Sequence, residues 1–319
     1  MHVAIIGGAS TIGSTFAYAL TTYRPDIDIT LVDIDADAAT GHATDLSHGT
    51  YHLANAPTDS ASGRIDAIHS EAIDTISPDV AVVTAGGPPP DPADLDRDFR
   101  DTRIGPIAAM LDDIAGQLQA IGPLPVINVT NPLDRVTAYF FQRLGWSRSY
   151  FIGYALSETA RAAAAIGQVA DVHPHRVRCP VMGEHGEHMV IVFSQTRVDG
   201  APVDLSPTDR EQVIDYVQDV PLQIAEQRGL TESSRWVTSA GLRRLIEHIE
   251  SEPTTDTLCL STPLDGEYGF DTGCLSVPVQ LGSTGIRDII EWDLDPAERT
   301  RLDTAHRAIG ETLPDVDPL

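Results

Sequence analysis

A histidine between two glycines is the residue in this sequence best suited to acid–base chemistry. His185 lies in the segment 183–188, Gly-Glu-His-Gly-Glu-His, which follows a stretch with strand character. Flanking glycines predict an exposed imidazole in a turn where backbone can approach a ligand, and imidazole titrates near neutral pH. A structural histidine is one alternative, and a zinc pair with His188 is another. Three-residue spacing and the helix-breaking Gly186 disfavour zinc, so no metal is expected.

A glutamate and an arginine near the start of an alanine-rich stretch form the second candidate group. Glu158 and Arg161 are three residues apart, so on a helix they share a face. They could form an ordinary surface ion pair. In a functional interpretation Glu158 orients the histidine, and Arg161 binds a substrate carboxylate through two parallel hydrogen bonds. Asn131, before a proline and after another predicted strand, is either a ligand contact or a turn residue.

A glycine turn after the first predicted strand could cradle a dinucleotide. The segment 7–13 reads Gly-Gly-Ala-Ser-Thr-Ile-Gly, with Gly7 and Gly13 at the outer positions of the motif and Ser10 or Ala9 in place of the middle glycine. Such a turn places pyrophosphate at a helix N-terminus. Asp33, which ends the second predicted strand, could accept hydrogen bonds from ribose hydroxyls and would favour NAD over NADP. A packing turn is the alternative.

The elements that would position these residues alternate between strand and helix. Short apolar runs at 2–6, 27–32, 80–84 and 126–130 are each followed by glycine, asparagine or a helix-like stretch. This alternation predicts an α/β fold with a parallel, doubly wound sheet over residues 1–150. Residues 151–319 are expected to form an α+β substrate domain. Helices are predicted at 161–166, 207–227 and 233–250, and strands at 177–182, 189–194 and 277–281.

Composition excludes several classes of function. The 319 residues carry 47 Asp and Glu against 21 Arg, with no lysine, for a formal charge of −26. This sign opposes nucleic-acid or anionic-membrane binding, and the absence of lysine excludes P-loop and Schiff-base chemistry. The surface is typical of a protein from a high-salt cytosol, where ions screen its self-repulsion. An ordinary acidic enzyme is the alternative, and neither a signal peptide nor a membrane span is expected.

A proline-rich segment precedes further arginines. Residues 86–92, Gly-Gly-Pro-Pro-Pro-Asp-Pro, can form neither helix nor strand, and they lead to Arg97 and Arg100. The segment is either a surface loop or a lid that brings an arginine onto a substrate.

Taken together, these motifs resemble the L-lactate/malate dehydrogenase family, and most of all its haloarchaeal malate dehydrogenase branch. Further matching segments over nearly the whole chain are 45–49, 84–86, 130–132, 266–269, 277–279 and 291–294. The resemblance implies an NAD-dependent hydride transfer between a 2-hydroxy acid and a 2-oxo acid.

The resemblance also implies a role for each matching residue. His185 would exchange the proton, Glu158 would fix its tautomer, Arg161 would bind the C1 carboxylate and Arg97 would polarise the carbonyl. The remaining implied contacts are with substrate at Asn131 and Arg100, and with NAD at Gly7, Ser10, Ile12, Gly13, Asp33, Thr84, Gly86 and Asn131.

Three departures from the family pattern affect the expected chemistry. Glu158 replaces an aspartate, which shifts the carboxylate by about a bond length, and Ser10 replaces a glycine. In the favoured lid register, Pro89, Pro90 or Asp91 stands where malate enzymes carry the arginine for a second substrate carboxylate. A lactate-like substrate is then expected. A second register would use Arg97 and Arg103 and restore malate.

Two further expectations concern the protein as a whole. The family's usual assembly predicts a homodimer or homotetramer. The acidic composition and the lack of an expected signal peptide predict a cytoplasmic location. The alternative to an enzyme is a catalytically silent dinucleotide-binding paralogue with a regulatory or structural role.

Overall fold

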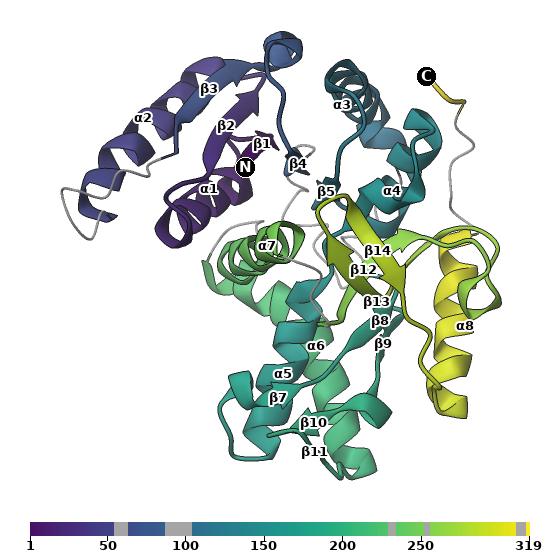
Figure 1. The fold of residues 1–319 in the computed structure, drawn as a ribbon. Helices are drawn as coiled ribbons and strands as arrows, with labels where there is room; N and C mark the ends of the chain where they lie inside the picture. Colours follow the sequence, from purple (N-terminus) through teal and green to yellow (C-terminus); the bar gives the residue numbers. More distant parts are fainter. Residues whose placement is uncertain (54–62, 87–103, 229–233, 252–255, 311–316) are drawn as a thin grey trace.

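A twisted sheet runs through the whole protein and carries helices on both faces (Figure 1). This computed structural model describes residues 1–53, 63–86, 104–228, 234–251, 256–310 and 317–319. Within these ranges no helix is long and apolar enough to cross a membrane.

Six parallel strands form the first part of the sheet in the order β3-β2-β1-β4-β5-β6. They are β1 (His2–Ile6), β2 (Asp28–Asp33), β3 (Ile65–His69), β4 (Val80–Val83), β5 (Val126–Asn128) and β6 (Phe151–Gly153). Ile5 of β1 lies opposite Leu31 of β2 on one side and Val82 of β4 on the other. This is the doubly wound order in which ligands bind beyond the carboxyl ends of the strands, and it confirms the predicted fold.

Helices pack on both faces of this part because successive strand side chains point to opposite sides. The helices are α1 (Thr11–Tyr23), α2 (Ala36–Leu53), α3 (Ala108–Ile121) and α4 (Leu133–Leu144), with short 3-10 helices at Ser70–Thr75, Gly105–Ile107 and Arg148–Tyr150. Ile5 joins a core with Phe16 of α1. Its neighbour Ile6 joins another core with Leu111 of α3 and Phe140 of α4.

The second half of the chain extends the same sheet with antiparallel strands. Strand β6 pairs β12, which pairs β13, and β13 also pairs β8 and β14. The helices are α5 (Leu156–Val169), α6 (Pro207–Arg228), α7 (Arg235–Glu250) and α8 (Pro296–Gly310). The sheet strands are β8 (Val181–Gly183), β9 (Met189–Ile191), β12 (Leu258–Pro263), β13 (Cys274–Gly282) and β14 (Gly285–Ile289). A small separate sheet contains β7 (Val177–Arg178), β10 (Arg197–Val198) and β11 (Ala201–Pro202), and single turns lie at Pro174–Arg176, Phe193–Gln195 and Glu267–Gly269.

Two predicted strands of this half are wrong in extent. The run 177–182 is divided between β7 and β8, which belong to different sheets. Pro180 lies at the break, and proline has no N–H to donate to a ladder. The run 189–194 ends as a strand at Ile191 and continues into a single helical turn. The predicted division of domains at residue 150 stays a prediction, since β6 directly after it belongs to the continuous sheet.

Two of the matching sequence segments, 266–269 and 291–294, contact each other in the second half of the chain. The Tyr268 N–H donates to Glu291 Oε2 at 2.7 Å, and the Trp292 N–H donates to the Tyr268 hydroxyl at 3.0 Å. Arg299 of α8 donates to the Tyr268 carbonyl at 2.7 Å. The segments 266–269 and 291–294 therefore hold the start of α8 against the sheet.

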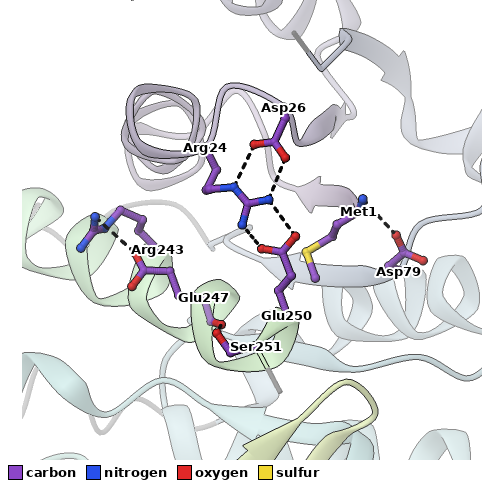
Figure 2. Close-up of polar contacts among 8 residues, drawn as sticks. All are labelled: Met1, Arg24, Asp26, Asp79, Arg243, Glu247, Glu250 and Ser251. Atoms are coloured by element: carbon purple, nitrogen blue, oxygen red, sulfur yellow. Dashed lines mark hydrogen bonds and ion pairs between the residues drawn. The ribbon is translucent and has the colours of Figure 1, made fainter. Parts of the chain in front are cut away.

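A polar cluster joins the two halves where α1 packs on α7 (Figure 2). Arg24, at the end of α1, pairs with Asp26 at 2.7 Å and also contacts Glu250, the last residue of α7. The Arg243 guanidinium of α7 lies 4.0 Å from the centroid of the Tyr23 ring. These contacts place α7 beside the helix that begins at the glycine turn.

Replacing Arg24 with alanine is expected to destabilise the protein by about 1 kcal/mol, because Asp26 and Glu250 lose a shared cation. The effect is expected to shrink in molar KCl, which screens exposed charges. Urea unfolding over a series of salt concentrations measures it. Arg176→Ala removes an exposed arginine that pairs with Asp199 on the surface and is the matched control. An Arg24→Ala effect no larger than that of Arg176→Ala would contradict the expectation.

Lowering the pH is expected to reduce the difference in unfolding free energy between the parent and Arg24→Ala. The hydrogen bond from Arg24 holds the pKa of Asp26 at about 2, below its ordinary 3.8. A carboxyl with a lowered pKa in the folded state stabilises the protein above the unfolded value and loses this effect as pH falls. The gap in unfolding free energy between parent and Arg24→Ala should therefore close between pH 3.8 and about 2.

Candidate active site

The glycine turn after β1 has the close packing that a dinucleotide cradle needs. Gly7 has φ +85°, and a Cβ there would lie 2.4 Å from the Ala85 nitrogen. A Cβ on Gly13 would lie 2.5 Å from the Gly7 carbonyl oxygen. Both positions thus require glycine, and the turn places the positive end of α1 at the carboxyl edge of the sheet.

Ser10 begins α1 and does more than replace a glycine. Its hydroxyl accepts the Gly13 N–H at 3.0 Å, which is an N-cap, and donates to Thr84 Oγ1 at 3.3 Å. Thr84 in turn donates to the Gly7 carbonyl at 2.9 Å. The serine therefore stabilises the turn but occupies one N–H group at the helix N-terminus.

Asp33 lies at the end of β2, beside the same turn. Its Oδ2 accepts the Ala9 N–H at 2.9 Å, and its Oδ1 accepts the Asp35 N–H at 3.0 Å. An ionised carboxylate has about four acceptor positions, so both oxygens can still accept ribose hydroxyls. Its negative charge disfavours a 2′-phosphate.

The other predicted cofactor residues surround this edge. Ile12 is half-buried in the first turn of α1, and Gly86 is exposed after β4 with no heavy atom within 4 Å of a Cβ built there. Asn131 is exposed in the turn between β5 and α4, with a cis peptide bond to Pro132. The glycine cradle, the acid and these open positions fit an NAD molecule lying across the sheet edge.

The predicted acid–base pair forms. His185 Nδ1 lies 3.1 Å from Glu158 Oε2 of α5, at an angle outside that of an aligned hydrogen bond. The side chains are 9% and 5% exposed, so the expected exposed imidazole and surface glutamate are both wrong. Because Nδ1 faces the carboxylate, Nε2 is the nitrogen available for proton exchange.

Arg161, one turn along α5, has a guanidinium with unused donors. It is buried, and its Nη2 donates to Ser234 Oγ at 2.8 Å. In the part of the chain that the structure describes, neither Nε nor Nη1 has a hydrogen-bond partner. Burial lowers the pKa of this guanidinium, which an incoming anion would oppose. Between these two described residues the alternative, an Arg161–Glu158 ion pair, does not form: Arg161 contacts Ser234, and Glu158 faces His185.

The lid residues cannot be compared with the structure. Arg97, Arg100, Arg103 and the positions of the missing arginine (Pro89, Pro90 and Asp91) lie outside the described residues.

Four residues close to these groups were not predicted. Asp134 and Arg135 in the first turn of α4 contact the histidine turn, and Ser234 contacts Arg161. Asn128, at the end of β5, supports the start of α4. The partners of Asp134, Arg135 and Ser234 are far away in sequence, and neither spacing nor composition indicates such contacts. Over the described ranges, no three His, Cys, Asp or Glu side chains gather as a metal site.

Comparison with known proteins identifies the family. The NAD binding domain of lactate/malate dehydrogenase matches residues 1–150, and the alpha/beta C-terminal domain of the same enzymes matches residues 158–315. The chain belongs to the lactate/malate dehydrogenase family.

Individual relatives cover almost the entire chain. Malate dehydrogenase from Halobacterium salinarum is 32% identical over 95% of both chains. L-lactate dehydrogenase 2 from Peribacillus psychrosaccharolyticus is 28% identical, covering 98% of this chain and 95% of the relative. Among solved structures, malate dehydrogenase from Aeropyrum pernix has a TM-score of 0.84 and 28% identity, covering 98% of each chain.

These relationships confirm the predicted fold, the NAD cofactor and the class of enzyme, an oxidoreductase of the malate/lactate dehydrogenase type. The relatives carry enzyme names, and nothing in the comparisons favours the silent paralogue. They include both malate and lactate enzymes, so family membership leaves the substrate open.

Proposed function

We propose that this protein oxidises an L-2-hydroxy acid with His185 as general base, Glu158 as the group that orients it and Arg161 as the carboxylate-binding residue. The observation that carries this proposal is the buried Arg161 guanidinium, whose Nε and Nη1 have no partner among the described residues, one helical turn from the glutamate that faces His185. A buried cation with unused donors requires an anion, and a planar carboxylate matches its geometry.

The contacts of the imidazole indicate which of its ring nitrogens takes the proton. Glu158 stabilises the tautomer with its proton on Nδ1, so Nε2 can take the substrate hydroxyl proton. A bound NAD would supply the acceptor for the hydride that leaves C2 with the electron pair of the C–H bond, which would give a 2-oxo acid. In the reverse direction His185 returns the proton to the carbonyl oxygen. Arg97 is proposed to stabilise the charge that develops there.

We further propose that the preferred substrate has a single carboxylate. The favoured register of the lid places proline or aspartate where an arginine would bind a second one. A dicarboxylate would then bring an unpaired charge into the site.

The expected result is that pyruvate is reduced with about tenfold or higher kcat/KM than oxaloacetate. NADH oxidation in molar KCl with a panel of 2-oxo acids measures this. A preference for oxaloacetate would instead support the register with Arg97 and Arg103, in which Arg97 binds the second carboxylate, and Arg97→Ala should then abolish that preference. NADH binding without turnover of any acid would contradict the enzymatic proposal and favour the silent paralogue.

We propose a high-salt cytoplasm as the setting and a homodimer or homotetramer as the assembly. The charge of −26 without lysine supports the first. Exposed aromatic side chains support the second: Tyr51 on α2, Tyr18 on α1 and Trp236 on α7 are 81%, 53% and 64% exposed on helices that pack in series. Light scattering over a KCl series tests the assembly and its requirement for high salt, and a monomer at every salt concentration would refute the assembly.

A further inference from the structure

The first turn of α4 binds the catalytic turn through two neighbouring residues. The His185 N–H donates to Asp134 Oδ2 at 2.7 Å, although the two residues are 51 positions apart. Next to this contact, Arg135 Nη1 pairs with Glu184 Oε1 at 3.0 Å. Two consecutive residues of one element thus hold two consecutive residues of the other.

Both contacts are buried, which sets them apart from the surface ion pairs of this protein. Asp134 is 1% exposed, and the side chains of Arg135 and Glu184 are 6% and 4% exposed. Burial raises the pKa of Asp134 to about 6, and the Ser261 hydroxyl and the N–H donated by His185 oppose this shift. Buried ion pairs add little net stability compared with apolar side chains, so a different role for this group has to be considered.

The first turn of α4 is itself fixed to the parallel sheet. Asn128, which ends β5, donates from Nδ2 to the Leu133 carbonyl at 3.2 Å and to Thr137 Oγ1 at 3.1 Å. Its Oδ1 accepts the Thr130 N–H at 3.0 Å. Asn131, which the family resemblance implies to contact both NAD and the substrate and therefore to lie on the nicotinamide side of the site, lies between these anchored residues in the sequence.

Two elements therefore control different properties of the histidine. Glu158 of α5 faces the ring nitrogen and sets the tautomer and the ring orientation. Asp134 of α4 binds the backbone N–H, which sets where the turn lies relative to the sheet. Glu184 links the turn internally, because its Oε2 accepts the His188 N–H at 3.3 Å.

We propose that Asp134 and Arg135 are positioning residues that hold the general base in register with the nicotinamide side of the site. The inference rests on the proposed function, since it assigns their purpose through His185. A displacement of about 1 Å in a reacting group can lower the rate about 100-fold, so loss of this attachment should affect turnover more than cofactor binding.

The test compares three single variants of the whole protein in molar KCl. Asp134→Ala removes the acceptor, whereas Asp134→Asn keeps an oxygen that can accept the same N–H. Asp112→Asn is the matched control. Asp112 of α3 accepts from the Tyr139 hydroxyl and Arg143 of α4, so it also supports α4 but does not contact the histidine turn.

Two measurements are made on each variant. Hydrogen exchange of the peptide containing residues 183–188 should be about tenfold faster in Asp134→Ala and unchanged in Asp112→Asn. The kcat should fall about 100-fold in Asp134→Ala with an unchanged Kd for NADH, and Asp134→Asn should recover at least about tenfold of that loss.

Each outcome decides a separate point. Unchanged kcat in a folded Asp134→Ala protein, or an equal loss of kcat in Asp112→Asn, would overturn the inference. If Asp134→Ala does not fold, the double variant Arg135→Gln, Glu184→Gln removes the second attachment. Its kcat should fall about tenfold, and parental kcat would overturn the inference. A parent without turnover contradicts the proposed function alone, since exchange still reports whether α4 holds the turn.

Discussion

Replacing His185 with alanine should lower kcat about 1,000-fold and leave the affinity for NADH within about twofold of the parent. General acid–base groups contribute about 100- to 10,000-fold to the rate. The imidazole faces Glu158 of α5, whereas the cofactor is proposed to lie on the glycine turn before α1. Stopped-flow measurement of NADH oxidation gives kcat, and quenching of protein fluorescence gives the affinity.

His188→Ala is the matched control for this variant. It removes an imidazole three residues further along the same turn and keeps the backbone N–H that donates to Glu184. Parental activity of His188→Ala is expected, and an equal loss in both variants would favour the zinc interpretation of the pair. Undiminished turnover of His185→Ala would refute the assignment of the general base.

Replacing Arg161 with lysine should lower kcat/KM for the 2-oxo acid about 1,000-fold, with most of the effect in KM. Lysine keeps the positive charge but loses the planar fork that binds both carboxylate oxygens. Truncating one side of a buried, hydrogen-bonded charge pair costs about 2 to 5 kcal/mol, which corresponds to this range. Binding of NADH should be unaffected.

The matched control is Arg176→Lys, the same change at an exposed arginine that pairs with Asp199. Steady-state kinetics over a range of acid concentrations separates KM from kcat for both variants. If Arg161→Lys leaves KM and kcat at the parental values, the free donors of Arg161 do not bind the substrate carboxylate.

The local hydrophobic pattern was sufficient to predict most of the parallel part of the sheet. The β-branched runs at 2–6, 27–32, 80–84 and 126–130 all contain strands, because a buried parallel strand is apolar throughout. The pattern failed around Pro180, where one apolar run serves two sheets. Hydrophobic periodicity reports that a residue is buried but not which partner covers it.

The candidate site also contains residues that local spacing predicted and residues that it did not. Local spacing was sufficient to place the glycine turn, since Gly7, Gly13 and Asp33 lie within one strand–helix–strand unit. The pairing of His185 with Glu158 was one of two interpretations of the residues, and the family resemblance favoured it, because nothing in the spacing of residues 27 apart indicates that they meet. Asp134, which contacts His185, and Ser234, which contacts Arg161, were not predicted at all.

The sequence by itself determined the parallel sheet, the dinucleotide turn, the acidic character and the chemical types available to the site. Only the tertiary structure decided that Glu158 faces His185 while Arg161 binds Ser234, and that α4 holds the catalytic turn. The physical reason is that helical spacing brings Glu158 and Arg161 to one face, but burial against different neighbours determines which charge each one meets.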